Sequence, residues 1–272
     1  AIHGNFDDAQ TGVKKLFGNK ELEKEMAEAG FQFSSANSIN IGRLVPQVVY
    51  YVYAYAKLLE NEQIENGEEI NVVVPTGNFG NILAAYFAKH MGVPIKTLIC
   101  ASNDNKVLYD FFTTGTYDRK REFILTNSPS MDILISSNLE RLIYLSTGCD
   151  AAADAALSEK GSYTVTGNMR QFMSDFRGGF ATEAQNEATI RKIFEDTGYL
   201  IDTHTGVAAT VYNAYKAETG DQTKTVIAST ASPYKFSHSV LEAIKGKSAV
   251  EGKDEFAVVD ELSEVSGTPV PK

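Results

Sequence analysis

Short apolar runs alternate with longer segments of mixed polarity along most of the chain. The apolar runs are rich in β-branched residues, which is typical of strands buried in a parallel sheet. We expect strands at Phe31–Phe33, Ile70–Val74, Ile95–Ala101, Ser162–Thr166, Tyr199–Ile201 and Thr223–Ala228, and the end of another at Ala1–Gly4. Helical spacing and capping residues predict helices at Ala9–Ala29, Leu44–Leu59, Ile82–Met91, Lys106–Phe112, Ser128–Leu145, Asp150–Ser158, Thr182–Thr197, Asp202–Thr219 and Ser237–Lys245. This alternation predicts an α/β fold with a mainly parallel sheet flanked by helices.

The predicted helix at Leu44–Leu59 is almost wholly apolar. A helix that is apolar on most faces is buried, so we expect this one in the core. Pro46 must lie in its first turn or kink it, because proline donates no backbone hydrogen bond. Farther along, Gly178-Gly179 is expected to break the chain, and the segment from Gly246 onward is expected to be weakly organised.

A polar turn with two glycines, Thr76–Asn81, joins a predicted buried strand to a predicted helix. The first amides of a helix have no intrahelical partner, and the helix dipole places partial positive charge there, so this arrangement favours an anion. We expect Gly77 and Gly80 to adopt φ values that other residues resist. The alternative is a plain strand–turn–helix joint. The turn lacks the G-x-G-x-x-G and P-loop patterns, so it predicts a phosphate without specifying a dinucleotide or ATP.

Two other turns share the topological position of this one. Ser34–Arg43 is rich in small polar residues and stands at the mouth of the apolar helix; the alternative is a capping loop with a surface arginine. Ser229–Ser232 follows the last predicted strand. Ligands of parallel α/β sheets bind beyond the carboxyl ends of the strands, so we expect all three turns to form one site.

Composition narrows the class of protein. The 272 residues suffice for one large or two modest domains, and the formal net charge of −10 argues against a nucleic-acid partner. No apolar stretch approaches the roughly 20 residues of a membrane span, so we expect no membrane partner. The two cysteines form no C-x-x-C and the four histidines match no zinc spacing, so we expect no metal site and a reducing, cytoplasmic location.

Five blocks of the sequence together resemble one enzyme family. They are GNFDDAQ, SSANSINIGRLVPQVVYY, PTGNFGN, SPSMDI with ISSNLERL, and STASPYKF. In this order they closely resemble threonine synthase of the bacterial and fungal type, from Gly4 to about Phe236. The resemblance implies pyridoxal 5'-phosphate (PLP) as cofactor, the tryptophan synthase β-like scaffold (PLP fold type II), and conversion of O-phosphohomoserine and water to threonine and phosphate. It leaves the oligomeric state open.

The resemblance also implies roles for individual residues. Those matching the loop that holds the cofactor phosphate are Gly77, Asn78, Phe79, Gly80 and Asn81. Thr230 matches the hydroxyl residue at the pyridine nitrogen, and the residues matching the grip on the substrate phosphate are Asn37, Ser38 and Arg43. His204 lies in a family-like D-T-H-T segment that helix capping explains equally well. Ser232 stands where many relatives have histidine, so its role stays open.

No lysine of this chain matches the family's Schiff-base motif, which we expect upstream of Ala1. By resemblance, residues 1–30 are the end of the small domain and residues 31–272 the large domain. We therefore expect the chain to be a C-terminal portion that is inactive alone. Two alternatives are kept: a related PLP-dependent phospholyase that eliminates without adding water, and a non-catalytic anion-binding scaffold.

Overall fold

The computed structural model describes residues 3–4, 6–158 and 161–271, and it is organised around a four-stranded parallel sheet. The strand order is β5 (Phe176–Phe180), β2 (Ile95–Ser102), β1 (Ile70–Pro75) and β6 (Thr225–Ile227). A small antiparallel sheet pairs β3 (Thr116–Asp118) with β4 (Ser162–Thr164). The predicted α/β class with a mainly parallel sheet is confirmed.

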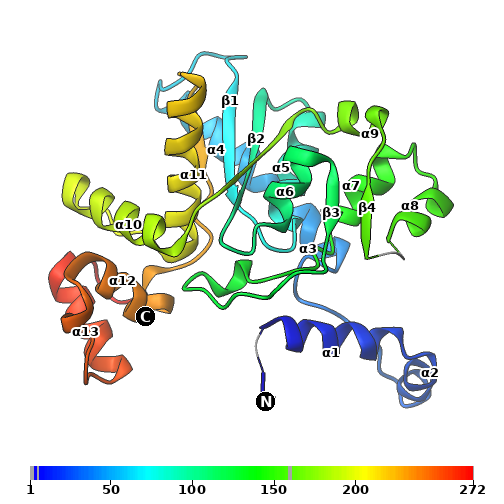
Figure 1. Ribbon diagram of the computed structural model, residues 1–272, viewed down its shortest axis with the longest axis horizontal. Helices are drawn as coiled ribbons and strands as arrows, with labels where there is room; N and C mark the ends of the chain where they lie inside the picture. The colour runs from blue at the N-terminus through cyan, green and yellow to red at the C-terminus, as the bar shows by residue number, and fades with distance from the viewer. Residues whose placement is uncertain (1–2, 5, 159–160, 272) are drawn as a thin grey trace.

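Helices surround the main sheet (Figure 1). They are α1 (Phe6–Gly18), α2 (Lys20–Glu28), α3 (Ile41–Leu44), α4 (Val48–Glu60), α5 (Gly80–His90), α6 (Val107–Thr114), α7 (Leu139–Ser146), α8 (Ala151–Ser158), α9 (Gly167–Phe172), α10 (Glu183–Thr197), α11 (Thr203–Thr219), α12 (Ser237–Lys245) and α13 (Glu255–Ser266). Four short 3₁₀ turns are η1 (Val45–Gln47), η2 (Pro129–Met131), η3 (Pro233–Phe236) and η4 (Lys247–Ala249).

The central strand β1 is buried on both faces. Successive side chains of a strand point to opposite faces, so Val72 and Val74 pack into the core that includes α4 and α5, whereas Val73 packs against α11. All six residues of β1 are buried, which is why this strand is a continuous apolar run in the sequence. A third apolar cluster holds α10, α12 and α13 together.

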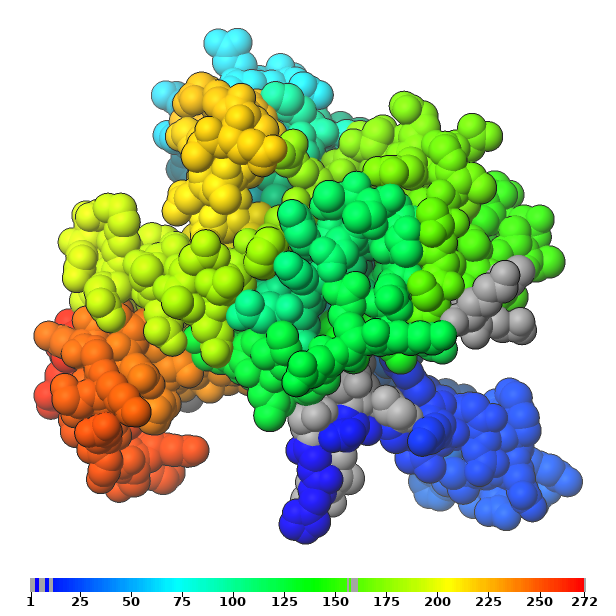
Figure 2. Space-filling model, in the orientation of Figure 1, coloured from blue at the N-terminus to red at the C-terminus, as the bar shows by residue number. Residues whose placement is uncertain are grey.

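The N-terminal helices differ from the prediction. The expected single helix at Ala9–Ala29 is broken at Asn19, whose extended backbone and side-chain oxygen cap α2 by accepting from the amides of Glu21 and Leu22. Figure 2 shows this blue segment projecting from the main body. Of the predicted strand end, His3 and Gly4 form a bend and residues 1–2 lie outside the described residues. The boundary near residue 30 stays a prediction.

Two predicted strands are absent from the described residues, and strand β5 forms where a chain break was predicted. Neither Phe31–Phe33 nor Tyr199–Ile201 joins a ladder in the described chain. Gly178 and Gly179, expected to break the chain, instead lie inside β5. A Cβ on Gly179 would lie 2.4 Å from Val211 Cγ1 on α11. These glycines therefore allow helices to pack closely on the edge strand.

Other predicted elements are revised by buried contacts. The helix expected at Ser128–Leu145 is split into η2 and α7, because buried Asp132 accepts side-chain hydrogen bonds from Asn103, Asn105 and Thr126 that hold the intervening loop. The segment after Gly246 is not weakly organised: it contains α13, which buries Val258 and Leu262. Segments without a predicted element also form β3 and α9.

The apolar helix begins after a 3₁₀ turn that contains Pro46, and it is only half-buried. Pro46 lies in η1, between α3 and α4. One face of α4 is buried, whereas Val49 and Tyr53 on another are 62% and 61% exposed, so the expectation of full burial is wrong. The neighbouring elements cover only the face that meets α5.

Among the described helices, none is long and apolar enough to cross a membrane.

Candidate functional site

A cavity of about 220 Å³ lies beyond the carboxyl end of β1. Its lining comprises Ser38, Gln47, residues 74–82, Ser130, Met131, His204, Thr230, Ala231 and Lys235. All three polar turns predicted to converge contribute to this lining. A parallel sheet brings them together because the carboxyl ends of its strands share one edge.

The glycine turn presents unpaired amides to this cavity. Across the described chain, no protein acceptor bonds the backbone N–H groups from Gly77 to Ile82. The opposite side of the turn is fastened: the carbonyl oxygen of Gly77 accepts from Ser136 Oγ at 2.8 Å, and that of Asn78 accepts from Asn138 Nδ2 at 2.9 Å. The six amides and the α5 dipole thus form a candidate anion site.

The strained residue of the turn is a phenylalanine, not a glycine. Phe79 has φ 65° and is held there by its buried ring, whose centroid lies 5.9 Å from Phe112 and 5.6 Å from Phe176. The expectation of unusual φ at Gly77 and Gly80 is wrong. These positions are glycine because a Cβ would lie 2.4 Å from the Ser130 carbonyl oxygen or from Ser38, respectively.

The Ser38 turn is docked onto the cavity by Arg141. Its guanidinium donates to the carbonyl oxygens of Ser38 and Ile39 at 3.0 and 2.9 Å. The hydroxyl of Ser38 accepts from Asn138 Nδ2 at 3.1 Å, which leaves its own proton free for a ligand. Burial lowers the pKa of Arg141, yet a guanidinium remains charged at neutral pH.

The structure does not bring Asn37 and Arg43 into the cavity lining. Asn37 Oδ1 accepts from the amide of Ile39 at 3.0 Å and so shapes the turn. Arg43 is exposed, and its side chain makes no hydrogen bond or ion pair within the described residues. Asn40 caps α3, whose buried residue is Leu44, and this places Arg43 on the outer surface. Roles for both residues in substrate binding stay predictions.

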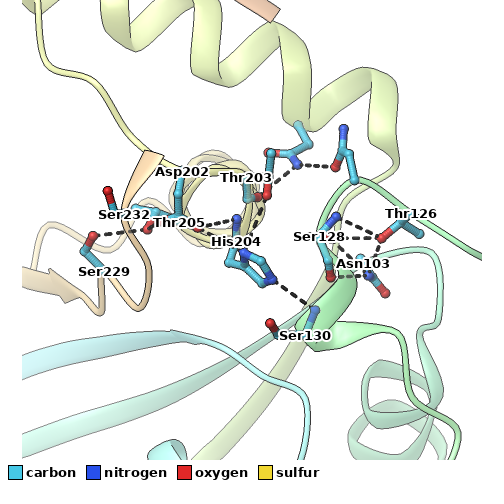
Figure 3. Close-up of polar contacts among 12 residues, drawn as sticks. Asn103, Thr126, Ser128, Ser130, Asp202, Thr203, His204, Thr205, Ser229 and Ser232 are labelled. Atoms are coloured by element: carbon cyan, nitrogen blue, oxygen red, sulfur yellow. Dashed lines mark hydrogen bonds and ion pairs between the residues drawn. The ribbon is translucent and has the colours of Figure 1, made fainter. Parts of the chain in front are cut away.

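His204 connects two walls of the cavity (Figure 3). Its Nδ1 lies 3.0 Å from Asp202 Oδ1, and its Nε2 accepts the backbone N–H of Ser130 at 3.1 Å. These partners fix the tautomer with the proton on Nδ1. Asp202 also accepts from the Thr205 hydroxyl, which in turn lies 3.3 Å from Ser229 Oγ, next to Thr230. This buried network therefore links the η2 turn to the loop after β6.

The pairing of His204 with Asp202 is structural. A general base needs a free lone pair, but the lone pair of His204 Nε2 already binds Ser130 N–H. Burial alone would raise the pKa of Asp202, but hydrogen bonds from His204 and Thr205 outweigh it and hold the pKa below its usual value. Ser232 lies outside the lining and caps η3, accepting from the Tyr234 amide at 3.3 Å.

Sequence reasoning missed three polar lining residues: Gln47, Ser130 and Lys235. Lys235 is the one lysine or arginine of the lining, and its ammonium forms no ion pair within the described chain. The location of Lys235 just after the last strand could have predicted it as a site residue. The sequence around Ser130 and Gln47 gives no such indication, because a serine after Pro129 and a glutamine at the start of an apolar helix have ordinary local roles.

Replacing Lys235 with glutamine is expected to weaken binding of inorganic phosphate about two- to fivefold at low ionic strength, and less at high salt. The reason is that an exposed charge contributes roughly 1 kcal/mol or less and is screened. Calorimetric titration at two ionic strengths checks this, with exposed Lys247→Gln as the matched control. Equal affinities for Lys235→Gln and wild type at low salt would remove Lys235 from the site.

Comparison with known proteins shows what this chain is similar to. Residues 205–269 match the family model "Threonine synthase, C-terminal". The chain is 40% identical to Threonine synthase-like 1 of Homo sapiens over 253 residues (90% of this chain, 34% of that protein) and 35% identical to threonine synthase of Saccharomyces cerevisiae over 265 residues (90% and 50%). The crystal structure of PLP-bound threonine synthase from Brucella melitensis superimposes with a TM-score of 0.76 at 37% identity (97% and 54%).

The fold and its sheet-edge cavity therefore define the PLP-enzyme scaffold of fold type II. Within that class, the chain is homologous to the threonine synthases, bacterial and fungal ones included. It spans about a third to just over half of the length of these relatives, from 34% to 56%.

Proposed function

We propose that this chain supplies the cofactor-binding domain of a PLP-dependent threonine synthase in the cytoplasm. The protein would convert O-phosphohomoserine and water to L-threonine and phosphate, in threonine biosynthesis. The observation that carries the proposal is the row of six unpaired amides at the start of α5, facing a cavity to which all three sheet-edge turns contribute. Homology to threonine synthases supports the same assignment.

The residues present fit pyridoxal phosphate. Gly77, Asn78, Phe79, Gly80 and Asn81 would hold its phosphate through backbone amides, because no side chain or carbonyl fills the space before them. Thr230 lines the same cavity, and its hydroxyl has no partner among the described residues, so it would serve the ring nitrogen. When bound, the cofactor supplies the electron sink for carbanion chemistry. The chain contributes orientation, charge compensation and exclusion of water.

On the substrate side, Ser38 is the residue best supported to bind the phosphate of O-phosphohomoserine, because it lines the cavity with a free hydroxyl proton. Asn37 and Arg43 complete the proposed set by family resemblance. A guanidinium suits a phosphate in shape and sign. Arg43 on its exposed turn would reach the substrate only if that turn closes.

Arg43→Lys tests this part of the proposal in the active protein. Lysine keeps the charge but loses the two-pronged hydrogen bonding. The transition-state stabilisation that kcat/KM for O-phosphohomoserine reports should therefore fall by about 1.5–3 kcal/mol. Cofactor absorbance should be retained. Steady-state kinetics measured with the absorbance spectrum decides. Unchanged kcat/KM would show that Arg43 is a solvent-exposed surface residue with no role in substrate binding.

The activity itself is tested by product analysis of the protein expressed from its complete gene. We expect threonine and phosphate in equal amounts, with one oxygen-18 atom from labelled water in the threonine hydroxyl. Release of phosphate with a keto acid and ammonia would favour the phospholyase alternative. Phosphate binding without turnover would favour the anion-binding scaffold.

A further inference from the structure

Asn138 is a fully buried residue at the start of α7, between the glycine turn and the Ser38 turn. Its backbone N–H and its Nδ2 atom both donate to the carbonyl oxygen of Asn78, at 3.1 and 2.9 Å. Nδ2 also donates to Ser38 Oγ at 3.1 Å, and Oδ1 accepts from the guanidinium of Arg141. One side chain therefore bonds both turns, yet it belongs to neither the cofactor set nor the substrate set described above.

The partners of the Asn138 amide fix its orientation. A guanidinium can only donate and a carbonyl oxygen can only accept, so Oδ1 must face Arg141 and Nδ2 must face Asn78. The flipped amide would set donor against donor at one end and acceptor against acceptor at the other. The second proton of Nδ2 therefore points at Ser38 Oγ, and the serine oxygen can only accept it.

The Ser38 hydroxyl is thereby left as a donor at the edge of the amide row. Its proton has no acceptor among the described residues. Ser38 lines the cavity, and its Oγ lies against the start of α5, because a Cβ on Gly80 would be only 2.4 Å from it. The oxygens of a phosphate monoester are strong acceptors at neutral pH. A phosphate held by the glycine turn can therefore accept from this hydroxyl as well.

Arg141 stands at the far end of the same chain of hydrogen bonds. The guanidinium lies outside the cavity lining and donates to Asn138 Oδ1, and Asn138 Nδ2 donates to Ser38 Oγ. With a phosphate bound, three successive bonds would all run in one direction, from the cation toward the anion. Bonds aligned in this way polarise and strengthen one another. Asn138 thus links a positive charge behind the wall of the cavity to the hydroxyl on its inner face.

We propose that Asn138 is a positioning residue that holds the Ser38 hydroxyl as a hydrogen-bond donor to a phosphate group in the cavity. Without the Nδ2 proton, the hydroxyl is free to rotate and to turn its own proton away from the ligand. The carbonyl of Asn78 keeps its bond from the Asn138 backbone N–H whatever the side chain, so the effect of Asn138 on phosphate passes through Ser38. The inference rests on the anion site of the proposed function and adds the residue that orients one of its donors.

The test is a double-mutant cycle, read by calorimetric titration of the whole chain with inorganic phosphate at pH 7. Ser38→Ala should weaken binding about tenfold, as expected for the loss of a hydrogen bond to a charged group. Asn138→Leu keeps the size of the side chain and should weaken binding about three- to tenfold when Ser38 is present. In the Ser38→Ala background the same change should have no further effect. A purely structural role of Asn138 would weaken binding equally in both backgrounds.

Exposed Asn168→Leu and Ser174→Ala are the matched controls and should leave the affinity for phosphate unchanged. Thermal unfolding shows whether each variant is folded. If Asn138→Leu does not fold, nuclear magnetic resonance of the Asn138 side-chain amide replaces it. Phosphate should shift this signal saturably in wild type, and the shift should be lost in Ser38→Ala.

Equal losses from Asn138→Leu in both backgrounds, a side-chain amide shift that survives Ser38→Ala, or normal affinity in Ser38→Ala overturns the inference and leaves the anion site intact. Failure of folded wild type to bind phosphate overturns both. In the protein expressed from its complete gene, the same cycle distinguishes two phosphates. Coupling in the KM for O-phosphohomoserine would assign Ser38 to the substrate, and coupling in the affinity for PLP would assign it to the cofactor; either result supports the inference.

Discussion

Gly80→Ala is expected to abolish measurable phosphate binding and to destabilise the fold by about 1–3 kcal/mol. Gly80 is the first residue of α5, and its new methyl group would lie 2.4 Å from both the Cβ and Oγ of Ser38. Relief requires moving either the helix start, which carries the anion-binding amides, or the Ser38 turn, which Arg141 fixes from the other side. Either movement opens the cavity.

The matched control is Gly12→Ala on α1, where an added Cβ meets nothing within 4 Å. This variant should bind phosphate like wild type and be slightly more stable, because alanine favours a helix more than glycine does. Calorimetry and urea unfolding measure the two effects separately. Normal phosphate affinity in folded Gly80→Ala would show that the close approach of Ser38 to α5 does not shape the site.

Asp202→Ala is expected to lower the free energy of unfolding by about 3–5 kcal/mol, the range for breaking a buried charged network. Asp202 is fully buried and accepts from the amide and ring of His204 and from the hydroxyl of Thr205. Removing the carboxylate leaves these donors unpaired and releases the η2 turn from α11. Asp254→Ala is the control, because Asp254 also caps a helix but is exposed, so its loss should cost about 1 kcal/mol.

The stabilisation by Asp202 should depend on pH in the acid range. Its pKa is lower in the folded than in the unfolded protein, so the contribution is fully present above the unfolded pKa of about 3.9 and is lost as pH falls through the folded value. Urea unfolding from pH 7 to pH 2 should therefore show wild type and Asp202→Asn converging below about pH 4. A constant difference down to pH 2 would contradict the charged state assigned to Asp202.

The central unit β1–turn–α5 was predictable because its signals are local. A buried parallel strand must be an apolar run, and a helix start must leave amides unpaired. The remaining features depend on contacts between distant residues. Nothing near Phe79 in the sequence reveals its positive φ, because the rings of Phe112 and Phe176 hold it. Gly179 resembles a chain break until Val211 is packed against it.

The candidate site divides in the same way. The three turns at the sheet edge were predictable from topology, and the structure brings Ser38, Thr230 and the glycine turn together. The role of His204 was not, because it depends on Ser130, a partner far along the chain. Arg43 was predicted as a site residue but does not line the cavity. A suitable residue type beside a polar turn does not by itself bring a side chain into a cavity.

The most direct test of the account follows the backbone amides of the glycine turn by nuclear magnetic resonance of the nitrogen-15-labelled chain. We predict that inorganic phosphate, and separately pyridoxal phosphate, shift the signals of Gly77 to Ile82 saturably, while the signal of Gly12 stays fixed. Unchanged signals from the turn in a folded protein, or saturable shifts confined to other residues, would contradict the assignment of these six amides as the phosphate site.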